Sequence, residues 1–202
     1  MIKRNVFRKE KEVNRFINLL KQTEKINIDL LINYLENETD FFVAPASSNY
    51  HGNYYGGLLE HSLLVYDNMV KINNMLINPF NKNELIISGL LHDICKSNFY
   101  TDSIRNKKID NKWVQEPYFA VDDMNPLGHG EKSVIIIQQF IKLNENELYA
   151  IRWHMMSYDD VTRGYTGNLS LTNALTKYPI ITLIHMADLF SISLLLKEVK
   201  ND

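Results

Sequence analysis

Residues 86–96 read Ile-Ile-Ser-Gly-Leu-Leu-His-Asp-Ile-Cys-Lys, a largely apolar run that contains His92 and Asp93 near its end. The apolar residues favour a buried helix that continues to about Cys95. A lone carboxylate in such surroundings is costly unless it is paired or bound to a metal. His92 and Asp93 therefore need polar partners from other parts of the chain.

Helical patterns dominate on both sides of this run. Upstream, the predicted elements are an amphipathic helix at 6–20, a short helix at 28–35, a loop at 40–57 and a long helix at 58–76. Downstream, they are a β-hairpin at 98–122, a helix from about 130, a helix from 144 through 154, a loop at 157–170 and a last helix at 180–199. The pattern predicts one all-α domain, residues 1–202, with a small inserted hairpin.

Several asparagines stand where helices begin or strands turn. We expect Asn83 to cap the helix of the quoted run, and Asn144 with Glu147 to form a capping box three residues apart. Asp110-Asn111 is the expected turn of the hairpin.

The composition fits a soluble globular chain. Of 202 residues, 45% are hydrophobic and 23% are charged, and 22 Lys and Arg against 24 Asp and Glu give a formal net charge of −2. That charge does not support a broad electrostatic grip on a nucleic acid polymer. Cys95 is the single cysteine, and the chain shows neither a secretory signal nor an apolar run long enough for a membrane span. We therefore expect a cytoplasmic protein.

Buried polar residues recur in two other predicted helices. His61 follows Gly-Gly-Leu-Leu-Glu at the start of one, and Asp188 lies within the apolar last helix, three residues after His185. A shared metal centre would explain the buried histidines and carboxylates together, because a metal offsets their desolvation. Imidazole and carboxylate ligands suit Mn, Fe, Co, Ni or Zn, and a structural zinc site is excluded because there is no cysteine cluster.

This set of residues resembles the HD superfamily of metal-dependent phosphohydrolases. The residues that match the family pattern are, in order, His61, the pair His92-Asp93 and Asp188, within segments 56–63, 90–96 and 187–189. A subset of the superfamily has two further histidines and a second metal, and His129 and His154 stand in the corresponding positions. Residues 51–62 are similar to the HD domains of certain bacterial 3′-to-5′ exoribonucleases and of relaxase-associated proteins.

The resemblance covers about residues 45–195, behind N-terminal helices at 1–40, and it implies the helical bundle of HD domains. One position departs from the family: the glycine of the usual His-Asp-x-Gly-Lys pattern is Cys95 here. Glycine readily adopts a left-handed helix end, whereas cysteine does so less well. The position of Lys96 is therefore less firmly predicted than that of the metal ligands, and we interpret Cys95 as a small buried residue.

The resemblance implies two divalent transition metals at one centre. The expected ligands are His61, His92, Asp93, His129, His154 and Asp188, with Asp93 bridging the metals. A hydroxide shared by the metals would attack the phosphorus atom. Besides Asp93, we expect catalytic roles for Lys96 and for His51, which would protonate the leaving group. The candidate phosphate contacts are Lys96, Lys132, Arg152 and Arg163. For His185 two interpretations stay open: it supports a ligand or serves as a spare ligand, or it has no role in the site.

The expected activity is hydrolysis of a phosphoester bond of a small nucleotide, linear or cyclic. The net charge and the lack of an oligonucleotide-binding barrel favour a small substrate over a polymer. The alternatives are a nuclease for RNA or single-stranded DNA, a di-iron oxygenase and a catalytically silent nucleotide-binding module. Aromatic residues of the 40–57 loop, the hairpin and the 157–170 loop either stack on a base or pack the hairpin onto the helices. The sequence leaves the base, the type of bond and the oligomeric state open.

Overall fold

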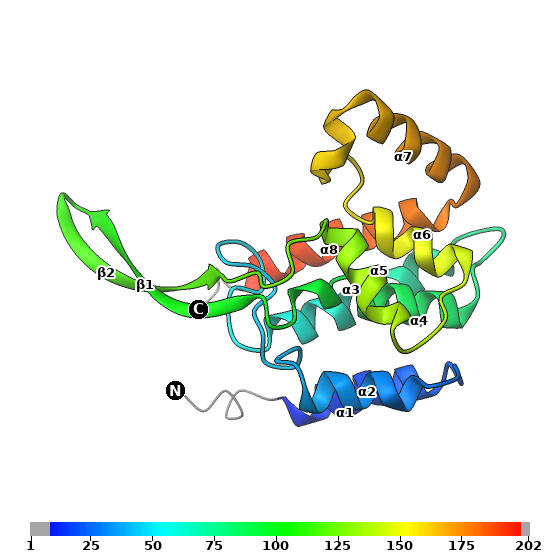
Figure 1. The fold of residues 1–202 in the computed structure, drawn as a ribbon, viewed down its shortest axis with the longest axis horizontal. Coiled ribbons are helices and arrows are strands. Elements are labelled where there is room, and N and C mark those ends of the chain that lie inside the picture. The colour runs from blue at the N-terminus through cyan, green and yellow to red at the C-terminus, as the bar shows by residue number, and fades with distance from the viewer. Residues whose placement is uncertain (1–8, 199–202) are drawn as a thin grey trace.

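The computed structural model describes residues 9–198, which form a helical bundle with one projecting β-hairpin (Figure 1). The α-helices are α1 (Glu10–Lys21), α2 (Ile28–Asn37), α3 (Gly57–Asn73), α4 (Lys82–Leu91), α5 (His129–Gln138), α6 (Glu145–Trp153), α7 (Tyr165–Lys177) and α8 (Ile180–Glu198). The strands are β1 (Tyr100–Ile109) and β2 (Lys112–Val121), and short 3₁₀ helices are η2 (Ile94–Lys96), η3 (Met156–Tyr158) and η4 (Asp160–Arg163). The expected all-α bundle with a small hairpin is confirmed.

The core lies between α3, α4, α6 and α8. Helix α3 packs against α4 and α8, and α6 packs against α4, α5 and α8. Fully buried side chains from these helices fill the space between them, among them Leu59, Ile86, Leu90, Ile151 and Ile184. Burial of apolar surface is the main favourable contribution to folding. This core therefore fixes α3, α4, α6 and α8 relative to one another.

Two glycines permit unusually close helix contacts. A Cβ atom on Gly89 of α4 would lie 2.8 Å from the Cα atom of Tyr66 in α3. A Cβ atom on Gly130 of α5 would lie 2.1 Å from the carbonyl oxygen of Arg152 in α6. Neither distance is tolerated between real atoms, so only glycine lets these backbones approach so closely.

An aromatic cluster anchors the loop that precedes α3. The ring of Phe16 in α1 lies 5.1 Å from the ring of Phe41 and 5.5 Å from that of Phe42. Further along, the N–H of Ala46 donates to the carbonyl of Gly52, which folds residues 46–52 back on themselves. The loop at 40–57, expected from its composition, is therefore an ordered segment.

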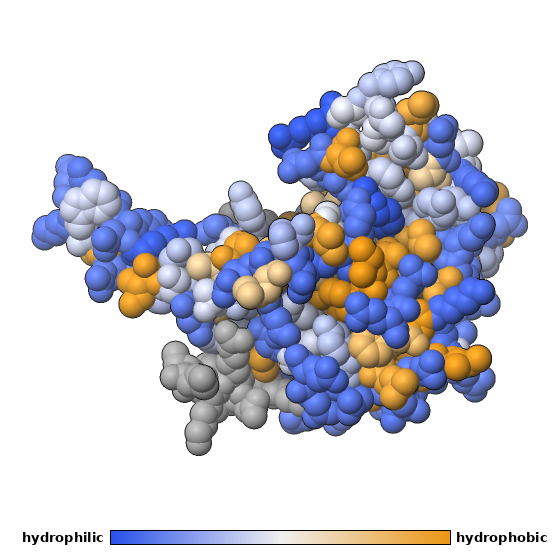
Figure 2. All heavy atoms as spheres, viewed as in Figure 1, coloured by the Kyte–Doolittle hydropathy of each residue, from blue (hydrophilic) through white to orange (hydrophobic). Residues whose placement is uncertain are grey.

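The hairpin projects from the helical body beside this loop (Figures 1 and 2). Its strands pair antiparallel from Tyr100 opposite Val121 to Ile109 opposite Lys112. Asp110 and Asn111 have φ angles of 48° and 62°, as a tight two-residue hairpin turn requires. The predicted hairpin and its turn are confirmed.

Some predicted boundaries are wrong. Helix α3 ends at Asn73 rather than near residue 76, and α4 ends at Leu91, before η2. The cap of α4 is Asn81, which forms a capping box with Glu84, whereas Asn83 lies inside the helix. The capping box of Asn144 and Glu147 is confirmed.

The loop predicted at 157–170 is also wrong, because that stretch contains η3, η4 and the start of α7. Helix α7 buries only Leu171 and Ala174, so it lacks the apolar periodicity that reveals a helix in sequence. Val6, the predicted start of the first helix, and Val199, the predicted end of the last, lie outside the described residues. Within the described part, none of the helices has the length and hydropathy needed to cross a membrane.

Candidate metal centre

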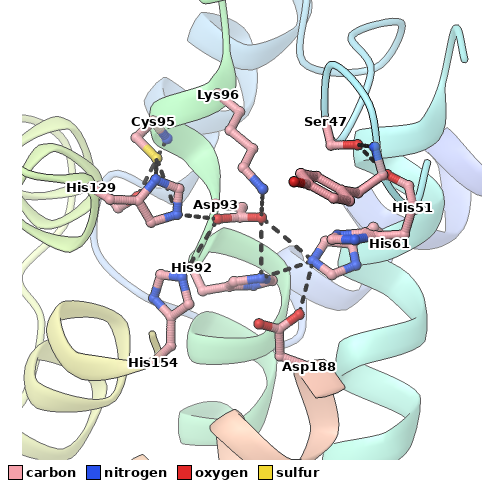
Figure 3. Close-up of polar contacts among 12 residues, drawn as sticks. Ser47, His51, His61, His92, Asp93, Cys95, Lys96, His129, His154 and Asp188 are labelled. Atoms are coloured by element: carbon pink, nitrogen blue, oxygen red, sulfur yellow. Dashed lines mark hydrogen bonds and ion pairs between the residues drawn. The ribbon is translucent and has the colours of Figure 1, made fainter. Parts of the chain in front are cut away.

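Six predicted ligands from separate parts of the chain meet at one place in the bundle (Figure 3). His61 lies in α3, His92 and Asp93 directly follow α4, and Asp188 lies in α8. His129 is the first residue of α5, and His154 follows α6. The close helix contacts at Gly89 and Gly130 bring these elements together, because each glycine lies within three residues of a cluster histidine.

Asp93 lies at the middle of the cluster, and its two oxygens face different residues. Oδ2 lies 3.4 Å from Nε2 of His61 and 3.5 Å from Nε2 of His92. Oδ1 lies 2.7 Å from Nε2 of His129 and 3.6 Å from Nε2 of His154. The cluster thus consists of two groups of potential ligands that share this one carboxylate.

Asp188 extends the first of these groups. Its Oδ1 atom lies 3.3 Å from Nε2 of His61. The first group therefore offers two imidazoles and two carboxylates, and the second offers two imidazoles and the other oxygen of Asp93.

Hydrogen bonds fix which nitrogen of each histidine carries its proton. Nδ1 of His92 donates to the carbonyl of Gly89 at 3.0 Å, and Nδ1 of His154 donates to the carbonyl of Ile151 at 2.8 Å. Since each Nδ1 carries the hydrogen, each Nε2 of a neutral ring presents a lone pair to the cluster. Burial lowers the pKa of His92 to about 3, so this ring is neutral at pH 7.

Ser191 fixes the third histidine in the same way. Its hydroxyl donates to the backbone carbonyl of Asp188 at 2.7 Å and lies 3.0 Å from Nδ1 of His61. Because the hydroxyl hydrogen is used in the first bond, the hydroxyl accepts from Nδ1 of His61 in the second. His61 therefore also presents the lone pair of its Nε2 to the cluster.

This donor set fits a divalent metal. The Nε2 atoms of His61 and His92 lie 3.2 Å apart, although as lone pairs they cannot bond to each other. Nε2 of His154 and Oδ1 of Asp188 are buried and have no hydrogen-bond partner among the described residues. Buried acceptors that converge without donors are costly, and a cation satisfies them together. Nitrogen and oxygen ligands of this kind suit Mn, Fe, Co, Ni or Zn.

His129 differs from the other three histidines. Its Nε2 contacts Asp93, and its Nδ1 lies 3.4 Å from the sulfur of Cys95. Burial opposes a positive charge on this ring, but Cys95 and Asp93 outweigh burial and raise the pKa of His129 to about 10. In the absence of metal this ring carries a proton, which a metal held at the second group would have to displace.

Lys96 is the cation closest to the shared carboxylate. Its ammonium lies 2.6 Å from Oδ2 of Asp93. Burial would lower the pKa of Lys96, but Asp93 outweighs burial and raises it, so the side chain is charged. For Asp93, burial would raise the pKa, but the charge of Lys96 holds it well below its usual value.

A pocket of about 200 Å³ opens beside this pair. Its lining includes Lys96, His129, Tyr100 and the predicted phosphate contact Lys132. The ammonium of Lys132 pairs with Asp123, which also lines the pocket. The structure thus brings both predicted lysines to one pocket at the second group of ligands.

The two predicted arginines are held elsewhere. Arg152 pairs with Glu131 and Asp159, and its guanidinium lies 3.9 Å from the ring centroid of Trp153. The side chain of Arg163 is 82% exposed and pairs with Asp160 in its own short helix. Neither arginine lines the pocket of Lys96 and Lys132. Their role as phosphate contacts stays a prediction. The ion pairs argue against it, because both guanidinium groups are already paired with carboxylates.

His51 and His185 both lie next to cluster residues. The ring of His51 lies 4.9 Å from that of His61, and burial is the largest of the causes that lower the pKa of His51 to about 4. At pH 7 this ring is neutral, so protonation of a leaving group by it stays a prediction. Nδ1 of His185 donates to the backbone carbonyl of His154 at 2.7 Å, which supports the position of that ligand.

Sequence reasoning missed Ser191 as part of the site. The signal is a serine one helical turn after Asp188 in a predominantly apolar helix. Ser191 is fully buried, and its hydroxyl contacts two cluster residues, His61 and Asp188.

Comparison with known proteins gives one finding. The family model of the HD domain matches residues 58–177, which include five of the six cluster residues. Asp188 lies beyond the matched segment. Neither the curated proteins nor the solved structures yield a significant match. Because the match spans more than half of the sequence and contains the cluster, the chain belongs to the HD domain family.

Proposed function

We propose that this protein is a metal-dependent phosphohydrolase that cleaves a phosphoester bond of a small nucleotide. Membership of the HD domain family implies the superfamily of metal-dependent phosphohydrolases. The observation that carries the proposal is the convergence of three imidazole lone pairs on both sides of the Asp93 carboxylate.

The proposed centre holds two divalent metals. His61, His92, Asp188 and Oδ2 of Asp93 would hold one, while His129, His154 and Oδ1 of Asp93 would hold the other. Divalent metals bound here would lower the pKa of a water ligand and would place positive charge beside the phosphate oxygens.

The chain supplies further groups for the phosphate. Lys96 is charged and held against Asp93, so it can bind a phosphate oxygen without a large rearrangement. Lys132 lines the same pocket and supports a second contact. Both ammonium groups are paired with carboxylates, which limits the positions they adopt before substrate binds.

A small substrate and a cytoplasmic location are parts of this proposal. The net charge of −2 does not support binding to a long run of phosphates. Cys95 is a free cysteine, which agrees with a reducing compartment.

The test starts from protein stripped of metal by a chelator and reloaded with Mn²⁺. Mono-, di- and cyclic nucleotides are compared with a 20-nucleotide RNA at equal phosphodiester concentration. The proposal predicts that a small nucleotide turns over fastest and that His92→Ala removes the activity. Faster turnover of the RNA, with a steep decline as salt rises, would contradict the small substrate. Retained activity in His92→Ala would contradict the site itself.

A further inference from the structure

A second, larger cleft lies between the 40–57 loop and the hairpin. It has a volume of about 840 Å³, within the range of small-molecule sites. Four of its nine lining residues are aromatic, namely Tyr54 and Tyr55 from the loop and Tyr118 and Phe119 from β2. Asn53 and Ser103 add polar groups to the lining.

The aromatic walls are held in place by specific contacts. The ring of Tyr55 meets that of Phe119 edge to face, with 5.2 Å between centroids, and its hydroxyl donates to Asp102 at 2.5 Å. The guanidinium of Arg105 lies 5.1 Å from the ring centroid of Tyr118. Arg105 in turn pairs with Glu116 and donates to Asn49 of the loop. A preformed aromatic cleft binds a flat ligand without the entropic cost of ordering its walls.

Two segments of the chain connect the cleft to the surroundings of the metal centre. Tyr54 and Tyr55 follow His51 by three and four residues, and the ring of His51 contacts that of His61. On the hairpin, Asp102 lines the cleft and follows Tyr100, which lines the lysine pocket, by two residues. The root of the hairpin, around residues 100–102, therefore borders both the lysine pocket and the aromatic cleft.

We infer that the aromatic cleft binds the base of the nucleotide whose phosphate lies at the metal centre, an inference that rests on the proposed function. Aromatic side chains stack on any base because every base has a flat π face. Asn53 and Ser103 provide hydrogen-bonding groups for the polar edge of the base. The hairpin thus serves as a wall of the substrate site, and the cleft selects substrates that carry a base.

Tyr118→Ala tests this inference because Tyr118 lines the cleft and is not part of the metal centre. Two readouts are needed: binding of phosphate-free nucleosides to metal-free protein by calorimetry, and KM for the nucleotide compared with ribose 5-phosphate. We expect Tyr118→Ala to weaken nucleoside binding about tenfold and to raise KM for the nucleotide similarly, with KM for ribose 5-phosphate unchanged. Tyr118→Phe, which keeps the ring, should bind like the wild type.

Trp113→Ala is the matched control, since Trp113 lies near the tip of the same hairpin, is 71% exposed and does not line the cleft. Ile104→Glu is a second variant for the case that Tyr118→Ala fails to fold, because Ile104 lines the cleft yet is 65% exposed. A carboxylate there should also weaken nucleoside binding.

The outcomes separate the two proposals. Unchanged nucleoside binding in folded Tyr118→Ala and Ile104→Glu, or equal losses for nucleotide and ribose 5-phosphate, would overturn the assignment of the cleft. Hydrolysis of nucleotides by the wild type would then still support the proposed function. Conversely, nucleoside binding that depends on Tyr118 in a protein without hydrolytic activity would contradict the proposed function and support the cleft as a base site.

Discussion

Replacing Ser191 with alanine tests whether the hydrogen bond at Nδ1 of His61 prepares this ring for metal binding. The hydroxyl is fully buried, 3.0 Å from Nδ1 of His61 and 2.7 Å from the carbonyl of Asp188. Without it, Nδ1–H either stays buried and unpaired, or the proton moves to Nε2 and occupies the position that faces the metal. Both consequences weaken metal binding.

The expected magnitude follows from the loss of one such supporting hydrogen bond. These losses typically reduce metal affinity about 10- to 100-fold, which corresponds to about 1.4–2.7 kcal/mol of binding free energy. Competition with a chromophoric chelator for Mn²⁺ or Zn²⁺ measures the affinity directly. Ser88→Ala is the matched control, since Ser88 is also fully buried but its hydroxyl has no hydrogen-bond partner within the described part of the chain. Wild-type affinity in Ser191→Ala, or an equal loss in Ser88→Ala, would refute the reasoning.

Three other predictions follow from the same geometry. His92→Ala and Asp93→Ala each lose bound metal and activity, as elemental analysis and a hydrolysis assay would show, and full activity in either would contradict the ligand assignment. Gly130→Ala lowers the unfolding temperature and weakens metal binding at the second group, because the new Cβ atom would lie 2.1 Å from the carbonyl oxygen of Arg152. A melting curve like that of the wild type would contradict this prediction, since it would show that α5 and α6 can separate at no cost. Metal binding at the second group releases a proton from His129, whose pKa is raised to about 10, so apparent affinity increases as pH rises from 6.5 toward that value. Potentiometric titration measures this release, and pH-independent affinity would contradict it.

The sequence predicts those elements whose residues carry a local signal. The apolar stripes of α3, α4 and α8 and the turn at Asp110-Asn111 are such signals, and the structure agrees with them. The sequence also contains the signal for the cap of α4, because Asn81 is followed three residues later by Glu84, as a capping box requires. Asn83 is followed at that spacing by Ile86, which cannot form one. Helix α7 lacks such a signal because it buries so little.

For the site, the sequence indicates which residues are unusual but not what surrounds them. A histidine or aspartate inside an apolar helix signals a need for partners, and this was enough to group His61, His92, Asp93 and Asp188. The ion pairs of Arg152 come from two other elements, α5 and the segment after η3, so no local pattern reveals them. The same is true of the contact between Ser191 and His61, which joins α8 to α3.

The most direct test of the account is the number of metals bound per chain, measured by elemental analysis after equilibration with excess Mn²⁺. The account predicts two metals in the wild type and one in His154→Ala, because His61, His92, Asp188 and Oδ2 of Asp93 remain to hold the first. Hydrolysis of the nucleotide should fall together with the second metal. A wild-type protein that binds a single metal, or a His154→Ala variant that still binds two, would contradict a centre divided by the carboxylate of Asp93.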